Sequence, residues 1–215
     1  MIVPSDEISR LPSTVKTLFL RWTDVMDIRV RFNMPDSELH AAAHCERVLL
    51  YALLAGNEIY ADDAGALEIL AHAAIFHDTC RQDEYLDTGH GARAAVYYSK
   101  FCDTFKDIEF HNESAYLMRY HDLDDNDGRK AIACAFPVCS DKVAQFYSIF
   151  KDADALDRWR LGRYGLDTRY LRTDAARSLT GYARNITEQT VPVELRKSIE
   201  AEMEQILARE KRMKT

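Results

Sequence analysis

Apolar side chains recur every three or four residues along most of the chain, a spacing typical of amphipathic helices. The first stripe predicts a helix that begins near Ser13 and ends before Pro35. A second helix is expected from a cap at Asp36 or Ser37 as far as Gly56. The apolar positions of these two helices include Leu18, Phe19, Trp22, Val25, Met26, Val30, Leu39, Ala43, Val48, Leu49, Ala52 and Leu53.

The third predicted helix is apolar on nearly every side, unlike the first two. It begins at a cap supplied by Asp62 or Asp63, runs through Phe76 and ends in a polar cluster, residues 77–81. A helix with one apolar stripe lies at a surface, whereas a helix that is apolar all round is surrounded by others. We therefore expect this third helix to lie at the centre of the fold.

The second half of the chain continues the helical spacing. Helices are expected after Gly91, from Asn112 or Glu113 to His121, and over residues 129–135, 140–160, 173–185 and 193–214. The acidic segment 122–128 is expected to be a solvated loop, since it lacks the glutamate that a calcium loop carries at its twelfth position. The pattern predicts an all-α bundle of about nine or ten helices, with the last helix outside the core or used to form a homo-oligomer.

The composition excludes several classes of protein. With 8 Gly and 5 Pro in 215 residues, the chain is unlike disordered or collagen-like sequences. The formal net charge of −7 gives no overall attraction to nucleic acid or acidic lipid, so any phosphate site must be local. No apolar run is long enough to cross a membrane, and the amino terminus lacks an apolar leader. We expect a cytoplasmic protein that binds neither membrane nor bulk nucleic acid.

The histidines carry more chemical information than the cysteines. The five cysteines form no C-x-x-C pair, which indicates reduced, mostly buried thiols. Four of the seven histidines stand beside acids or glycines at the expected ends of buried helices: His44, His77, His90 and His121. Helical bundles bind divalent ions through imidazole and carboxylate groups from different helices, so the ligands lie far apart in sequence. The sequence supplies that pattern.

Three segments carry a resemblance to a known family. They are L-H-A-A-A-H-C-E-R-V-L-L-Y-A around His44, I-F-H-D-T-C-R with His77 and Asp78, and F-K-D-A-D-A-L-D-R-W-R, whose third residue is Asp152. In this order they resemble the HD-domain superfamily of metal-dependent phosphohydrolases. The resemblance implies one helical domain over residues 1–215, with a metal-binding core at about 36–160 and a helical extension at about 173–215.

By this resemblance, His44, His77, Asp78 and Asp152 bind one divalent metal ion. Asp154 is the alternative ligand at the last position, or a helix cap. Nitrogen and oxygen ligands without a thiolate suit manganese, magnesium, zinc, iron, cobalt or nickel. Neighbouring helical residues point about 100° apart, so His77 and Asp78 converge on one ion only if the helix loosens there or the ion lies between them.

The expected reaction is hydrolysis of a phosphate ester, of a nucleotide or a related small molecule, by metal-bound hydroxide. A bound ion lowers the pKa of its water from about 15.7 toward 7. Asp78 is expected to orient or deprotonate that water. His90 and His121 are expected to protonate the leaving oxygen or hold the phosphate rather than bind a second ion, and Arg81 is a further catalytic candidate.

An arginine-rich segment follows the predicted metal site. Residues 158–172 hold five arginines and one aspartate in a chain of negative net charge. Because the planar fork of arginine suits phosphate, Arg158, Arg160 and Arg163 are predicted to bind substrate, although arginines also pair with surface carboxylates. Together with H-D-T-C-R-x-D-E-Y-L-D-T-G-H-G, this segment resembles the HD proteins related to phosphodiesterase domains of bacterial effectors.

Two other functions are consistent with the same residues. A di-iron oxidase of the same fold would use the additional histidines for a second metal ion. A non-catalytic regulatory module would bind a nucleotide through the arginine-rich segment. Among the remaining histidines, we expect His40 and His72 to be structural or to support the ligands, and His111 to lie at the surface.

Overall fold

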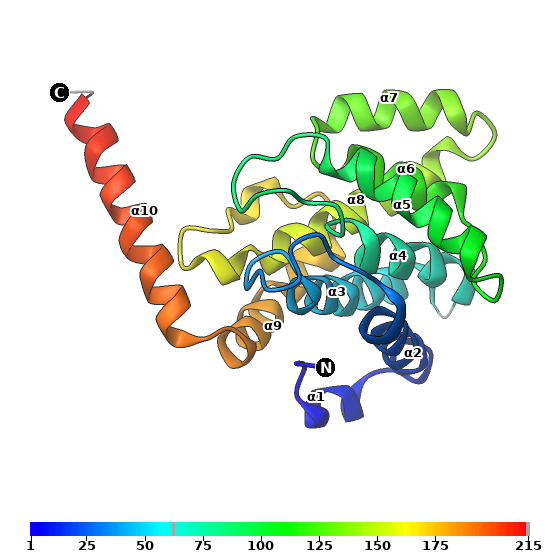
Figure 1. Cartoon of the computed structure of the whole chain (residues 1–215), viewed down its shortest axis with the longest axis horizontal. Coiled ribbons are helices and arrows are strands. Elements are labelled where there is room, and N and C mark those ends of the chain that lie inside the picture. The colour runs from blue at the N-terminus through cyan, green and yellow to red at the C-terminus, as the bar shows by residue number, and fades with distance from the viewer. Residues whose placement is uncertain (62, 214–215) are drawn as a thin grey trace.

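The computed structural model describes residues 1–61 and 63–213. Within those ranges it has ten α-helices, two short 3₁₀ helices and no strand, as the sequence pattern predicted (Figure 1). The helices are α1 (Ser5–Arg10), α2 (Ser13–Arg29), α3 (Ala42–Tyr60), α4 (Ala64–Phe76), α5 (His90–Thr104), α6 (Asn112–Tyr120), α7 (Asp125–Ala135), α8 (Ser140–Leu156), η1 (Asp157–Leu161), η2 (Thr168–Tyr170), α9 (Asp174–Thr190) and α10 (Val193–Met213).

Helices α3 and α4 form the centre of the bundle and pack along each other. Helices α2, α8 and α9 cover α3, while α2, α6 and α8 cover α4. Every residue from His44 to Leu53 is buried, and so is every residue from Leu70 to Phe76. Each large apolar side chain buried in this way stabilises the fold by about 1.5–3 kcal/mol. The central position predicted for α4 is confirmed.

The helix caps match the sequence prediction at α4 and differ from it at α3. Asp63 caps α4 by accepting a hydrogen bond from Ala66 N, and the alternative cap, Asp62, lies outside the described residues. The hydroxyl of Ser37 accepts from the backbone nitrogens of Leu39 and His40 and so closes a turn rather than a helix. Helix α3 therefore begins five residues later than Ser37, and His40 lies before it.

The acidic segment 122–128 is only partly a loop, which corrects the sequence prediction. Helix α7 begins inside this segment because Asp124 caps it by accepting from Asn126 N. Asp125 and Asp127 lie in its first turn, where the helix dipole favours negative charge. The same acids that predicted a solvated loop thus stabilise a helix start.

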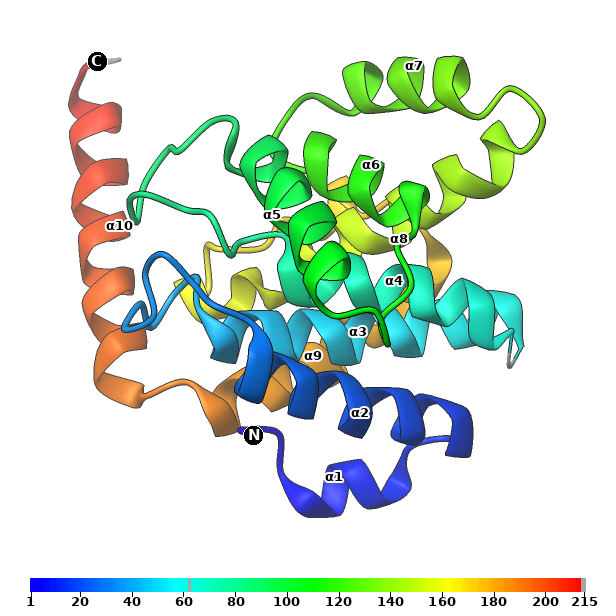
Figure 2. The same cartoon turned by 45° about the vertical axis from the view of Figure 1, so that its right-hand side comes forward.

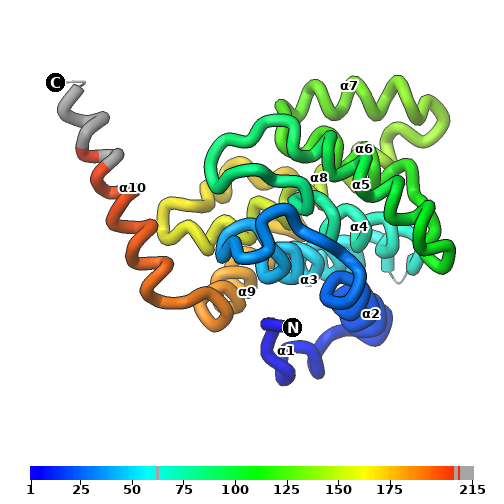
Figure 3. Tube along the Cα trace, in the orientation of Figure 1, coloured from blue at the N-terminus to red at the C-terminus, as the bar shows by residue number. Residues whose placement is uncertain are grey.

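Three long connections gather on one side of the bundle. Residues 30–41, 77–89 and 157–173 come together there, and α10 stands beside them, outside the bundle (Figures 2 and 3). Helix α10 packs against η1. No helix in the described part of the chain combines the length and apolar character that crossing a bilayer requires.

The five cysteines are free thiols, but they are less buried than expected. Cys45 and Cys102 are buried and Cys80 is half-buried, whereas Cys134 and Cys139 are exposed. Cys45 Sγ lies 3.9 Å from His77 Nδ1, and burial raises the pKa of this thiol well above its usual value. It is therefore a neutral neighbour of the histidine cluster and not a thiolate ligand.

Candidate metal centre

Asp78 lies where the chain leaves α4, and this position lets its carboxylate face several histidines. Helix α4 ends at Phe76, and the next hydrogen bonds, Thr79 N to Phe76 O and Arg81 N to Asp78 O, span three residues instead of four. The backbone therefore tightens into turns immediately after His77. The chain thus leaves regular α-helix by tightening, rather than by the loosening expected from sequence, and the side chains of His77 and Asp78 reach one site.

One group of ligand atoms surrounds His44 Nε2. It lies 3.1 Å from His77 Nε2, 3.4 Å from Asp154 Oδ1 and 3.6 Å from Asp78 Oδ2. His77 Nε2 lies 3.8 Å from Asp78 Oδ1 and 4.0 Å from Asp154 Oδ1. Ligand atoms about 2.1 Å from a common ion lie roughly 3.0–3.4 Å apart, so small movements would bring these four side chains onto one ion.

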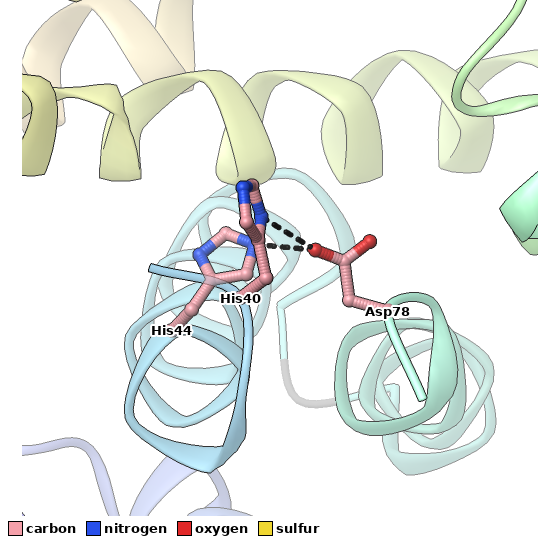
Figure 4. A group of neighbouring side chains, drawn as sticks. All are labelled: His40, His44 and Asp78. Carbon is pink, nitrogen blue, oxygen red and sulfur yellow. Dashed lines mark hydrogen bonds and ion pairs between the residues drawn. The ribbon is translucent and has the colours of Figure 1, made fainter. Parts of the chain in front are cut away.

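A second group shares the other oxygen of Asp78. Oδ1 lies 3.0 Å from His90 Nε2 and 3.6 Å from His121 Nε2, and the two Nε2 atoms are 2.9 Å apart. On the Oδ2 side, His40 Nδ1 lies 3.1 Å away. Figure 4 shows His40 and His44 side by side, both directed at this oxygen. The carboxylate of Asp78 thus stands between two sets of imidazoles.

The hydrogen bonds of the four cluster histidines fix which ring nitrogen faces the site. In His77, His90 and His121, Nδ1 lies 2.8, 2.6 and 2.7 Å from the carbonyl oxygen three residues earlier. In His44, Nδ1 lies 2.7 Å from Asp157 Oδ2. Because Nδ1 donates its proton in each case, Nε2 presents a lone pair to the centre. This is the tautomer that metal ligation needs.

The electrostatics of the cluster also suit a cation. Burial lowers the pKa of His77 to about 3, which keeps this ring neutral. Burial acts to raise the pKa of Asp78, but its interactions with the imidazoles of His77, His121, His40 and His90 outweigh burial and hold the pKa well below its usual value. For Asp154, burial is likewise outweighed by His44, and the pKa is lowered. Two ionised carboxylates and inward-facing lone pairs therefore meet in one place.

The prediction that Asp152 is the last metal ligand is corrected to Asp154. Residues two apart on a helix point about 200° apart, so these two carboxylates leave α8 on opposite sides. Asp152 is fully buried and accepts hydrogen bonds from Arg172 N, Arg172 Nη1, Thr173 N and Thr173 Oγ1 at 2.7–3.1 Å. Its lone pairs are already used. Asp154 faces His44 and His77 instead.

Asp157 belongs to the candidate site, although the sequence analysis did not single it out. It follows Asp154 by three residues, so the two lie on one face, and its Oδ2 accepts from His44 Nδ1. Arg47 Nε and Nη2 bind the same carboxylate at 2.5 and 3.1 Å. A carboxylate behind a ligating imidazole fixes the orientation of the ring and raises its basicity. The spacing D-x-x-D from Asp154 to Asp157 could have indicated from sequence that both acids lie on one helix face.

Two glycines let α5 bring His90 to the cluster. Gly89 has φ +90°, a left-handed conformation that favours glycine. A Cβ on Gly91 would collide with Met118 O and lie 2.7 Å from His121 Nδ1, so only glycine permits this approach of α5 to α6. The flanking glycines of T-G-H-G are therefore required by the position of His90.

A pocket of about 270 Å³ opens beside the cluster and receives some of the predicted arginines. Arg81, Arg158 and Arg160 line it, together with Leu39, His40, Asp78, Glu84, Tyr85, His90, His121, Asp122, Asp154 and Leu161. Arg163 points elsewhere: its backbone nitrogen donates to Glu200, and its guanidinium pairs with Glu204, both on α10. The structure therefore gives Arg163 no place among the substrate-facing residues.

Of the other histidines, His40 and His72 agree with expectation, and His111 differs from it. His40 lines the pocket and contacts Asp78, so it belongs to the site. His72 is buried between Trp22 and Tyr98 and makes a 2.7 Å hydrogen bond with the Tyr98 hydroxyl, in agreement with a structural role. His111 is half-buried with its ring against His72, rather than fully at the surface.

Comparison with known proteins gives no relative to set beside this site. No family model, curated protein or solved structure matches the chain. The candidate site accordingly stands on its geometry: three overlapping groups of His and Asp that are spaced to hold a metal ion, all containing His44, His77 or Asp78.

Proposed function

We propose that this chain is a metal-dependent phosphohydrolase of the HD type, which cleaves a phosphate ester of a nucleotide or a related small molecule. The observation that carries the proposal is the convergence of six side chains on one site, next to a pocket lined by arginines. The six are His44, His77, Asp78, His90, His121 and Asp154.

The residues of this chain fit a divalent ion and a phosphate in adjacent positions. When bound, such an ion would polarise a phosphoryl oxygen and lower the pKa of a coordinated water. Asp157 orients His44, and His40 holds one oxygen of Asp78, so the ligand set is pre-organised before substrate arrives. The guanidinium groups of Arg158 and Arg160 supply the positive charge that a phosphate requires.

His90 and His121 have a different role in this proposal from the one expected from sequence. Both side chains line the pocket, and their Nε2 atoms lie 3.0 and 3.6 Å from Asp78 Oδ1. We therefore propose that His90 and His121, together with Asp78, would hold a second ion, in place of the acid or phosphate-binding roles. This shared carboxylate is also the observation that keeps a di-iron oxidase as the second candidate function. Stoichiometric iron with a reducible ferric absorption, and no ester hydrolysis, would favour the oxidase.

The proposal is tested with bis-para-nitrophenyl phosphate and para-nitrophenyl phosphate, each with manganese and with chelator. We expect manganese-dependent release of nitrophenol by the wild-type chain and its loss in Asp78→Asn. Asp103→Asn, which changes an exposed acid on α5, is the matched control and should retain full activity. Hydrolysis that persists in Asp78→Asn or in the presence of chelator would overturn the proposal.

A further inference from the structure

Arg160 has a feature that its neighbours lack: hydrogen-bond donors that are buried and unused. The side chain lines the pocket beside the His and Asp cluster and is only 5% exposed. Its Nε and Nη1 make no hydrogen bond with any residue that the structure describes. The nearest carboxylate oxygen, Asp157 Oδ2, lies 3.5 Å from Nη1. Buried donors of a charged group that are left without an acceptor destabilise the folded state.

Arg47 and Arg81, the other buried arginines near the cluster, have their donors engaged. Arg47, equally buried, places Nε and Nη2 on Asp157. Arg81 donates from Nε to Asp83 O and from Nη2 to Tyr85 O, while its Nη1 lies 3.5 Å from His90 Nε2. Arg160 is thus a buried cation of this pocket, and its Nε and Nη1 lack a hydrogen-bond acceptor among the residues that the structure describes. An anion in the pocket would supply it.

At the mouth of the same pocket, the ring of Tyr85 is held out in solvent by a fixed backbone. Tyr85 is 82% exposed and makes no ring contact with the residues that the structure describes. Its backbone is nevertheless held at both ends: Tyr85 N donates to Asp83 Oδ1 at 2.7 Å, and Tyr85 O accepts from Arg81 Nη2 at 2.7 Å. An aromatic face that is exposed but positioned can stack on a planar ring of a ligand.

We propose that Arg160 and Tyr85 form the two ends of one substrate subsite. Arg160 binds the oxygens of a phosphate group, and Tyr85 stacks on an aromatic group attached close to that phosphate. The pocket thereby selects aryl or nucleoside phosphates over phosphates of sugars and alkyl alcohols. This inference rests on the proposed function, since it assigns the binding residues of the same pocket.

The test measures binding without turnover, in protein treated with chelator, by calorimetry. The probes are adenosine 5′-monophosphate, ribose 5-phosphate and inorganic phosphate. We expect Arg160→Gln to weaken binding of all three by about tenfold or more, because a hydrogen-bonded charge is lost. We expect Tyr85→Ala to weaken adenosine 5′-monophosphate alone, by about fivefold or more, and Tyr85→Phe to restore it. Circular dichroism and thermal melting establish that each variant is folded.

The matched controls lie on the same arginine-rich segment but outside the pocket. Arg169→Gln removes an exposed guanidinium that pairs with Asp167, and Tyr170→Ala removes a ring that is 74% exposed. Both should bind every probe as the wild type does. Because Arg160 is buried, Arg160→Lys provides a second variant that keeps the charge while losing the fork; it should recover part of the affinity if folding of Arg160→Gln is impaired.

The outcomes separate this inference from the proposed function. Affinities of folded Arg160→Gln and Arg160→Lys that stay within about twofold of wild type would overturn the phosphate role, even if hydrolysis of nitrophenyl esters is intact. Equal affinity for ribose 5-phosphate and adenosine 5′-monophosphate, or no loss in Tyr85→Ala, would overturn the stacking role. If binding depends on Arg160 and Tyr85 while no metal-dependent hydrolysis is found, this result would support the subsite and contradict the proposed hydrolase function.

Discussion

Two charged clusters lie on opposite sides of α8, and they are built in opposite ways. In the first, Asp152 accepts hydrogen bonds from Arg172 and Thr173, while Asp125 binds Arg172 and Lys151. Each acid in this cluster faces a base or a backbone N–H. Such a cluster is complete without any further group and ties α7, α8 and the start of α9 together.

In the second cluster, acceptors face acceptors. The Nε2 lone pairs of four imidazoles and the carboxylates of Asp78 and Asp154 point at one another, and the imidazole protons point away, toward backbone carbonyls and Asp157. Buried polar groups in folded proteins are satisfied, and a cation bound here would satisfy these acceptors. The comparison separates a structural acid from a functional one, although Asp152 and Asp154 are two residues apart.

The largest expected effect is the difference between the variants Asp154→Asn and Asp152→Asn. Asp154→Asn should lower metal-dependent hydrolysis by about 100-fold or more, because it removes a candidate ligand, and should leave the unfolding of the metal-free protein nearly unchanged. Asp152→Asn should instead lower the free energy of unfolding by about 3 kcal/mol, since it leaves Arg172 partly uncompensated. Activity assays and denaturant unfolding on both variants check this.

The reverse result would break the comparison. If Asp152→Asn lost its metal while remaining fully stable, the sequence-based ligand set with Asp152 would be correct and the side of α8 that faces the histidines would be misassigned.

Removal of the metal is the second test. A ligand that binds only the folded state stabilises it, by about 2.7 kcal/mol when its concentration is 100 times its dissociation constant. Chelator should therefore lower the melting temperature of the wild type and of Asp103→Asn, but not that of Asp78→Asn. Equal melting with and without chelator in the wild-type chain would show that no ion stabilises the fold.

A substitution of Asp157 tests whether its hydrogen bond with His44 Nδ1 pre-organises the site. Loss of such a supporting carboxylate costs about 10- to 100-fold in metal affinity. Asp157→Asn should show this loss in a metal titration, with hydrolysis recovering at high manganese because the ligands themselves are intact. An unchanged affinity would mean that His44 is held by its packing alone. Because Asp157 also faces Arg47, far-ultraviolet circular dichroism must first establish that the variant is folded.

The smallest effect concerns the pH dependence of the first cluster. Burial opposes ionisation of Asp125, but hydrogen bonds and charge from Arg172 and Lys151 outweigh it and lower the pKa to about 2. A pKa lowered by folding stabilises above the unfolded value, near 3.9, and this contribution is lost as pH falls toward 2. The free energy of unfolding of the wild type should exceed that of Asp125→Asn by about 1 kcal/mol or less at pH 6, given the partial exposure of Asp125, and this difference should disappear as pH falls through 2. A difference independent of pH would contradict the assignment.

The sequence predicted those parts of the molecule that depend on local pattern. The apolar stripes set the number of helices and the central place of α4, and the His-Asp pair at the end of α4 located the cluster. It could not decide among Asp152, Asp154 and Asp157, since all three belong to one continuous helical stretch and only the direction of each side chain distinguishes them. His40 was similarly hidden, because it joins the site through the turn closed by Ser37 rather than through a helical stripe.

The arginines show the same limit. The excess of positive charge in residues 158–172 indicated a phosphate site, but charge alone does not tell which guanidinium is free. Arg163 pairs with α10 and Arg169 with Asp167, whereas Arg160 is buried with unused donors. That distinction depends on contacts between segments far apart in the chain, which no local pattern records.

The central claim is that the cluster around Asp78 binds a divalent metal ion. The most direct test is metal content by plasma mass spectrometry, after equilibration with manganese and removal of free ion, for wild type, Asp78→Asn and Asp152→Asn. The account predicts one or two equivalents in the wild type, the same in folded Asp152→Asn, and almost none in Asp78→Asn. A wild-type chain without metal, or an Asp78→Asn variant that retains its full content, would contradict it.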